Sequence, residues 1–176
     1  MATRFIVVSL LVVLLSPALS YAETAWQSEK LGLSLKFPAY WKTETLPSQS
    51  DLAKGGVLVR AERTPGIPAG VRFELELQPL TIKRSSQQSA AETLIHALKQ
   101  TPKLQILKLE QAKVSDEVFE LRVKWKIAES RYSLESVYRI VDTAERRLVA
   151  SVSGRVELVA GIQEELNQLW ESIRVE

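Results

Sequence analysis

The side chains with the greatest catalytic potential in this sequence are one histidine, scattered serines and several neighbouring carboxylates. His96 is the only histidine, and the chain contains no cysteine. A catalytic triad needs a histidine beside a nucleophile, and a zinc site usually needs further nitrogen or sulfur ligands. With 3.6 residues per turn, His96 lies about 150° from the apolar stripe of its predicted helix, so we expect it to face solvent. We therefore predict no catalytic, metal-binding or cofactor-binding residue.

The serines, glycines and carboxylates also lack the spacing of catalytic motifs. No serine lies in a Gly-x-Ser-x-Gly elbow or a Ser-x-x-Lys motif, and the glycine pairs lack the lysine of a phosphate-binding loop. A carboxylate hydrolase would need two acidic side chains to converge in a cleft, within about 5–10 Å. The pairs Glu74 with Glu76 and Glu164 with Glu165 are instead typical of solvated faces. The sequence predicts a protein that is not an enzyme.

Three basic residues alternate along one predicted strand, at Arg122, Lys124 and Lys126. Alternate residues share one face of a strand, so these side chains form a patch that suits an anionic partner or a lipid headgroup. Alternating charge opposite an apolar face is also what a half-exposed sheet displays. The predicted cross-strand neighbour Glu135 neutralises part of this charge, so both interpretations stay open.

An aromatic cluster near the N-terminus is the second candidate surface. Phe37, Tyr40 and Trp41 follow one another closely, and Trp26 precedes them. Tryptophan and tyrosine are enriched in interfaces, so Tyr40 and Trp41 are candidates for contact with a partner or an apolar ligand. The alternative is that the cluster forms core at the end of the sheet, because Trp41 directly follows the apolar stripe of a strand.

The elements that must position these residues are strands joined by short turns, with two helices. The pattern predicts an opening strand pair or one bent strand over Trp26 to Phe37, ended by Pro38. Capping-box residues Ser89 and Glu92 predict the start of the first helix, which closes before Pro102. The remaining predicted strands are 56–63, 71–78, 104–113, 117–127, 132–141 and 147–153, and the last helix is 157–172.

The register of the central hairpin follows from matching side chains across its turn at 128–131. Trp125 then faces Leu134 and Lys124 faces Glu135, while a slip of one residue would expose the aromatic set. Continuing the same logic across the turn at 142–146 pairs Ile140 with Leu148. Hairpins dominate, so we predict an α+β fold in which a single antiparallel sheet is covered by helices.

The first 22 residues have the pattern of a secretory signal peptide. Arg4 is their only charge, an apolar run follows from Phe5 to Leu15, and the segment ends in small residues at Ala22. We expect residues 1–22 to be removed, although a retained anchor is the alternative, and residues 23–176 to form one domain. The expected location is the periplasm, with the thylakoid lumen or the extracellular space as alternatives. The net charge of +2 implies neither nucleic acid nor an anionic membrane as a partner.

Two segments resemble the PsbP-like superfamily, named for an extrinsic subunit of photosystem II. One is Leu33 to Trp41, a strand that runs into Phe-Pro and then tryptophan, and the other is the closing helix with its tail, Leu169 to Val175. Many relatives have Ser-Phe where this chain has Ser172 and Ile173. The resemblance implies an α/β/α sandwich and an accessory, assembly or binding role more often than catalysis. We carry no metal site over from it.

These observations lead to one expected function and two alternatives. We expect an exported, non-enzymatic accessory domain that binds or helps assemble another extracytoplasmic protein. One alternative is a carrier of a small apolar or lipid-like ligand, which predicts a pocket of several hundred Å³ between sheet and helix. The other is the carboxylate hydrolase. We expect no nucleic acid partner, and contact with the membrane only through an uncleaved signal peptide.

Overall fold

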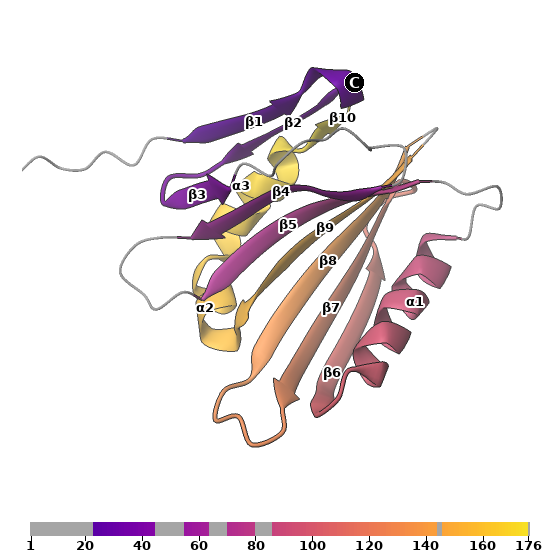
Figure 1. Ribbon diagram of the computed structural model, residues 1–176, viewed down its shortest axis with the longest axis vertical. Coiled ribbons are helices and arrows are strands. Elements are labelled where there is room, and N and C mark those ends of the chain that lie inside the picture. The colour runs from indigo at the N-terminus through magenta and orange to yellow at the C-terminus, as the bar shows by residue number, and fades with distance from the viewer. Residues whose placement is uncertain (1–22, 45–54, 64–69, 80–85, 144–145, 176) are drawn as a thin grey trace, which may run out of the picture.

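The computed structural model describes residues 23–44, 55–63, 70–79, 86–143 and 146–175 (Figure 1). The leader predicted over 1–22 and most of both loops that flank strand 56–63 lie outside the described residues. The elements are β1 Thr24–Ser28, a 3-10 turn Glu29–Leu31, β2 Leu33–Phe37, β3 Trp41–Glu44, β4 Gly56–Arg63, β5 Val71–Pro79, α1 Gln87–Gln100, β6 Leu104–Lys113, β7 Val118–Ile127, β8 Leu134–Asp142, β9 Arg146–Arg155, α2 Val156–Gly161, α3 Gln163–Ser172 and β10 Arg174–Val175.

Seven strands form the main sheet, in the order β3-β4-β5-β9-β8-β7-β6 with every neighbouring pair antiparallel. The predicted class, α+β with an antiparallel sheet and covering helices, is confirmed. A feature beyond that prediction is a small second sheet, in the order β1-β2-β10. The opening segment is a strand pair hinged at Gly32, whose φ of 58° lies in the left-handed region that glycine adopts without strain.

The helices cover one half of the main sheet on one face and the other half on the opposite face. We call face A the side of β5 that carries Phe73 and Leu75, and face B the side that carries Glu74 and Glu76. On face A, α2 and α3 lie over β4, β5 and β9, and the small sheet packs on α3 (Figure 1). On face B, α1 lies over the other half, β6 to β8. Each half of the sheet therefore has one covered and one uncovered face.

Strand β5 shows how the sequence builds this arrangement. Its residues alternate between buried apolar and polar, and Phe73 and Leu75 are at most 1% exposed on face A. Phe73 packs edge-on against Phe37 at 5.4 Å between ring centroids and also contacts Trp170 of α3 at 6.0 Å. A period of two with one buried face is the pattern of a half-covered antiparallel strand.

The register of β7 with β8 is confirmed: Trp125 pairs with Leu134, and Lys124 with Glu135. The predicted register of β8 with β9 is wrong by one residue, because Ile140 pairs with Val149 instead of Leu148. Thr143 closes a tighter turn, with hydrogen bonds to Arg146 from both its backbone and its hydroxyl. The slip moves Leu148 to face A, where it joins the core beneath α2 and α3.

Both predicted helices needed a correction, the first at its start and the second in its interior. Helix α1 begins at Gln87, and its N-cap is Ser86, whose hydroxyl accepts a hydrogen bond from the Ser89 N–H at 3.1 Å. The predicted Ser89 cap is therefore wrong, and Ser89 lies inside the first turn. The closing helix is broken at Ile162 into α2 and α3. Among the described residues, no helix combines the length and the apolar character needed to cross a membrane.

Candidate binding surfaces

Tyr40 and Trp41 lie at the start of edge strand β3 and have opposite surroundings. Trp41 is 4% exposed and packs against Phe37 in the core, so the core interpretation holds for this residue. Tyr40 is 46% exposed and has a φ of 76°, a left-handed conformation that is strained for a bulky side chain. The guanidinium of Arg63 lies 5.9 Å from the centroid of the Tyr40 ring. Of the pair, Tyr40 is the exposed residue and Trp41 the buried one.

Glu165 connects α3 to the start of β3 and the end of β4. Its carboxylate accepts two hydrogen bonds from Arg63, at 2.9 and 2.8 Å, and a third from the indole Nε1 of Trp41 at 3.2 Å. The Arg63 guanidinium holds the pKa of Glu165 below its usual value despite partial burial, and the same hydrogen bonds raise the pKa of Arg63. The predicted solvated role for Glu165 is therefore wrong, because this carboxylate joins a helix to two strands.

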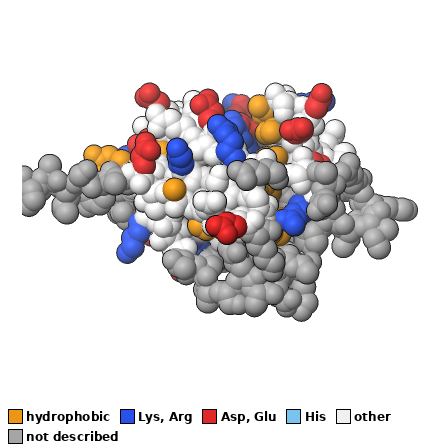
Figure 2. Space-filling model, turned by 90° about the horizontal axis from the view of Figure 1, so that it is seen from above, with side chains coloured by type: hydrophobic (Ala, Val, Ile, Leu, Met, Phe, Trp, Pro, Cys, Tyr) orange, Lys and Arg blue, Asp and Glu red, His pale blue; other side chains and the backbone are white. Residues whose placement is uncertain are grey.

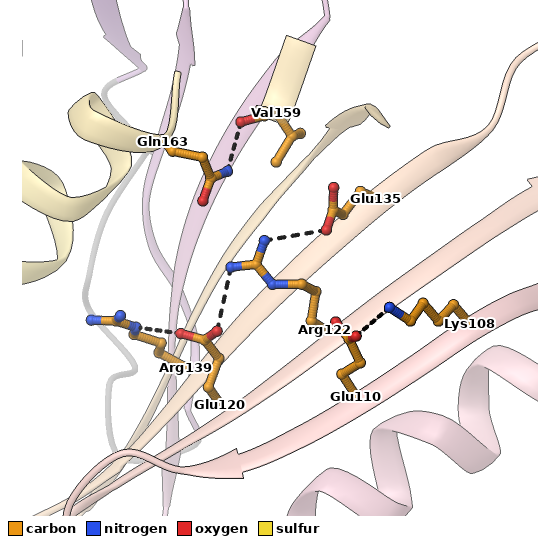
Figure 3. A network of polar contacts seen from close by, with 8 residues as sticks. All are labelled: Lys108, Glu110, Glu120, Arg122, Glu135, Arg139, Val159 and Gln163. Carbon is orange, nitrogen blue, oxygen red and sulfur yellow. Dashed lines mark hydrogen bonds and ion pairs between the residues drawn. The ribbon is translucent and has the colours of Figure 1, made fainter. Parts of the chain in front are cut away.

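The basic residues predicted on β7 lie on face A, beyond the edge of the helical cover. Trp170 of α3 marks that edge, where the guanidinium of Arg139 lies 5.0 Å from the centroid of the indole ring. From there a chain of ion pairs crosses the sheet: Arg139 to Glu120 at 3.0 Å, Glu120 to Arg122 at 3.4 Å, and Arg122 to Glu135 at 3.3 Å. Figure 3 shows Arg122 at its centre, between the two carboxylates.

Glu135 is more tightly held than the cross-strand prediction implied. It is the Cα partner of Lys124, yet its carboxylate pairs with Arg122, and its side chain is only 4% exposed. Lys124 and Lys126 have no ion-pair partner among the described residues. On the neighbouring strand β6, Lys108 pairs with Glu110 and lowers the pKa of that carboxyl below its usual value. The β7 patch therefore consists of a fixed ion-pair network around Arg122 and two lysines outside that network, Lys124 and Lys126.

We call this region the β6–β8 surface. It consists of the face-A charged residues of these three strands, whose backbone register places them side by side. Within the described chain it has five basic and three acidic members: Lys108, Arg122, Lys124, Lys126, Arg139, Glu110, Glu120 and Glu135. The sum is a local excess of two positive charges.

The structure does not bring the two predicted groups together. Tyr40 precedes β3 at one edge of the main sheet, and Arg122, Lys124 and Lys126 lie on β7 near the other edge. Four strands lie between β3 and β7, which corresponds to about 24 Å at the usual strand spacing. The α2–α3 layer lies between the two groups on face A. They are two separate surfaces.

The remaining candidates from the sequence are one histidine and the acidic side chains. His96 is exposed on α1. Glu74 is committed to an ion pair with Arg60 at 2.9 Å. Within the described ranges, no cluster of three or more histidine, aspartate or glutamate side chains is placed to hold a metal ion. On the β6–β8 surface, Glu120 and Glu135 are each paired with arginine, so these carboxylates act as counter-ions.

The hollows on the described part of the molecule include the three that follow. One, about 250 Å³, lies between the ends of β4 and β5 and helix α2, with Val71, Leu158 and Ile162 in its wall. That volume is below the roughly 300–1,000 Å³ of typical small-molecule sites. A polar groove of about 580 Å³ follows face B of β3 to β5, and another of about 590 Å³ lies between the small sheet and α3. From above, charged side chains of both signs are interspersed and hydrophobic atoms appear in small separate spots (Figure 2).

Comparison with known proteins gives a fold and no sequence family. No protein-family model matches the chain, and a search of curated proteins also finds no match. The cyanobacterial PsbP, CyanoP, of Synechocystis sp. PCC 6803 superposes with a TM-score of 0.59 at 9% identity, covering 89% of this chain and 94% of that protein. The fold is PsbP-like.

Two further solved structures share the PsbP-like fold. LpqN of Mycobacterium tuberculosis, described as involved in cell envelope biogenesis, has a TM-score of 0.51 at 13% identity and covers 88% of this chain and 90% of that protein. A protein of Bacteroides thetaiotaomicron has a TM-score of 0.51 at 12% identity and covers 86% of this chain and 48% of that protein. At these identities the likeness concerns the fold alone.

Proposed function

We propose that this chain is a non-enzymatic accessory domain that works outside the cytoplasm and binds another extracytoplasmic protein through the β6–β8 surface. The observation that carries the proposal is how the charged side chains of that surface are paired. Its arginines and glutamates are held in place by one another, while Lys124 and Lys126 remain without an ion-pair partner in the described chain. A surface that is ordered in advance loses little conformational entropy when a partner docks.

The charge of the β6–β8 surface indicates the kind of partner. An excess of two positive charges favours a partner with an acidic contact surface, because complementary charge speeds encounter and fixes orientation. The location outside the cytoplasm rests on the leader pattern of residues 1–22. The PsbP-like mycobacterial protein described as involved in cell envelope biogenesis is consistent with an envelope role.

Site-specific photo-crosslinking in living cells tests this proposal. A benzophenone amino acid replaces Lys126 in one variant and Lys42, an exposed lysine on face B of β3, in the control. We expect a discrete adduct with another protein from position 126 and none from position 42. Adducts of equal yield from both positions, or from neither, would contradict the proposal.

Charge reversal then tests the role of the lysines. With the crosslinker at Gln105, the exposed cross-strand neighbour of Lys126, we expect Lys124→Glu with Lys126→Glu to reduce the adduct by about tenfold, a magnitude typical of lost electrostatic steering. The matched control, Lys36→Glu with Lys99→Glu, makes the same change in net charge at exposed positions elsewhere. If both double variants give the same yield, the lysines do not direct the partner.

A further inference from the structure

Among the described residues, no strand pairs with the outer side of β6, which leaves this edge of the main sheet open. Strand β6 is the outermost strand of the seven and is ten residues long, about twice the usual length. Every residue from Leu107 to Lys113 is exposed. A long exposed edge strand presents a row of unpaired backbone groups that invites pairing with another strand.

The direction of these backbone groups follows from one hydrogen bond just beyond the strand. The Val114 N–H donates to the Val118 carbonyl across the β6–β7 turn at 2.9 Å. In an antiparallel ladder, alternate residues direct both backbone groups toward the same neighbour. Counting back from Val114, residues 112, 110 and 108 pair with β7, and Leu109, Gln111 and Lys113 direct their backbone groups to the open side.

Exposed apolar side chains gather along the same edge. Leu107 is 51% exposed and Leu109 is 36% exposed, and Val114, directly after the strand, is 53% exposed. Single exposed apolar residues are ordinary, but a series of them on an open edge strand marks an interaction site or an aggregation hazard. The irregularity between Ile106 and Lys108 disrupts the first half of the strand, as bulges on protected edges do. The half from Lys108 to Lys113 is regular.

We infer that β6, from Lys108 to Lys113, accepts an extended segment of the partner protein as an added strand. This inference rests on the proposed function and specifies how the partner binds. Added strands gain affinity from backbone hydrogen bonds and specificity from alternate side chains. The segment carries an apolar residue beside Leu109 on face B and a carboxylate beside Lys108 on face A. Lys108 and Lys124 are cross-strand neighbours that repel each other, and the partner's carboxylate reduces this repulsion.

Two of the registers in which a second copy of this chain could pair with the edge carry a conflict. Antiparallel pairing of two β6 strands about Glu110 would place that carboxylate opposite its own copy, which destabilises the pair. Pairing about Leu109 would bring the irregularity at Leu107 into the new ladder. A partner segment of different sequence avoids both conflicts.

Two substitutions at one position test the added strand. Gln111→Pro removes an outward N–H without touching the bonds to β7, and proline is tolerated on the open side of an edge strand. Gln111→Ala leaves that N–H in place and serves as the matched control. Each is combined with the crosslinker at position 126, and circular dichroism and thermal unfolding confirm that both variants are folded.

We expect Gln111→Ala to keep the adduct and Gln111→Pro to reduce it by about tenfold or more, since the new ladder is interrupted at its centre. An adduct kept in a folded Gln111→Pro variant would overturn the added strand while leaving the proposed function standing. An adduct with twice the mass of the chain would identify a second copy and overturn the stated occupant. Failure of the parent crosslink at position 126 would overturn both proposals.

Discussion

The Glu165→Ala substitution removes a carboxylate that joins α3 to β3 and β4. Three hydrogen bonds are lost, two from Arg63 and one from the Trp41 indole. Both donor side chains then remain in a partly buried site without this acceptor. Trp41 is 4% exposed, so its N–H has little access to replacement water. Leaving a buried donor without a partner costs the full desolvation free energy of that group.

The expected magnitude follows from these contacts. Hydrogen bonds to a charged group contribute about 1.5–3 kcal/mol, and the Arg63 and Glu165 side chains are 20% and 26% exposed, so partial screening moves the estimate to about 2 kcal/mol. For a chain of this size the melting temperature falls by about 4–8 °C. The assay is urea unfolding together with a thermal scan. Glu164→Ala, the exposed neighbour in the same helical turn, is the control and should change stability by less than about 0.5 kcal/mol.

The pH dependence gives a second reading of the same interaction. The pKa of Glu165 is lower in the folded protein than its usual value, so ionised Glu165 favours folding. That contribution is present above the ordinary glutamate pKa of about 4.3 and is lost as the pH falls through the lowered folded value. The stability difference between wild type and Glu165→Gln should therefore shrink between pH 7 and pH 3. A difference that stays constant over this range, or a Glu165→Ala variant as stable as Glu164→Ala, would refute the reasoning.

Four further outcomes are expected. Ser86→Ala should lower the free energy of unfolding by about 1 kcal/mol through loss of the N-cap, and Ser89→Ala by less than about 0.5 kcal/mol in the same denaturant titration. Leu169→Ala, at a fully buried position on the inner face of α3, should cost about 2–5 kcal/mol. Gly154→Ala should destabilise by about 1–3 kcal/mol or more, because its Cβ would lie 2.3 Å from the Gly70 carbonyl oxygen; a melting temperature equal to wild type would exclude that clash. Intact-mass measurement of the exported protein should give a chain that begins at Glu23.

The β7–β8 register was predictable because its large apolar side chains pair on one face and its opposite charges pair on the other. Trp125, Leu121 and Phe119 meet apolar partners on one face, and charged residues meet on the other, so a slip would be costly. Strand β9 offers no such signal. Leu148 faces one core and Val149 faces the other, because both faces of this central strand are covered. Hydrophobic pattern alone cannot choose between two registers of such a strand, and the length of the turn at Thr143 decided it.

The contacts of Glu165 were beyond local sequence reasoning for a different reason. Two acidic residues in a row within the helix predicted over 157–172 are typical of a solvated face. Which of them turns toward the sheet depends on Arg63 and Trp41, which are 102 and 124 residues away in the chain. The break in the helix at Ile162 also changes the helical phase, and that phase determines the face of the helix on which each carboxylate lies. Long-range pairing and helix phase must both be known before this site can be inferred.

The two uncovered faces of the sheet differ in a way that decides between them as binding surfaces. On face B of β3 to β5, the register makes two cross-strand rows of alternating sign, Lys42-Glu62-Arg72 and Glu44-Arg60-Glu74. These rows balance to zero charge, and each side chain has an opposite charge on the adjacent strand, so an incoming charged group gains little there.

The β6–β8 surface is not balanced, because Lys108 and Lys124 are direct cross-strand neighbours of the same sign. Such a pair is unfavourable within the isolated domain. An acidic side chain placed beside it turns that repulsion into attraction, so the gain on binding is larger here than on face B. The ion pair of Lys108 with Glu110 offsets part of this repulsion, and the excess of two positive charges on the surface remains. The open edge of β6 adjoins this pair, which places the outward backbone groups and the excess positive charge at the same site.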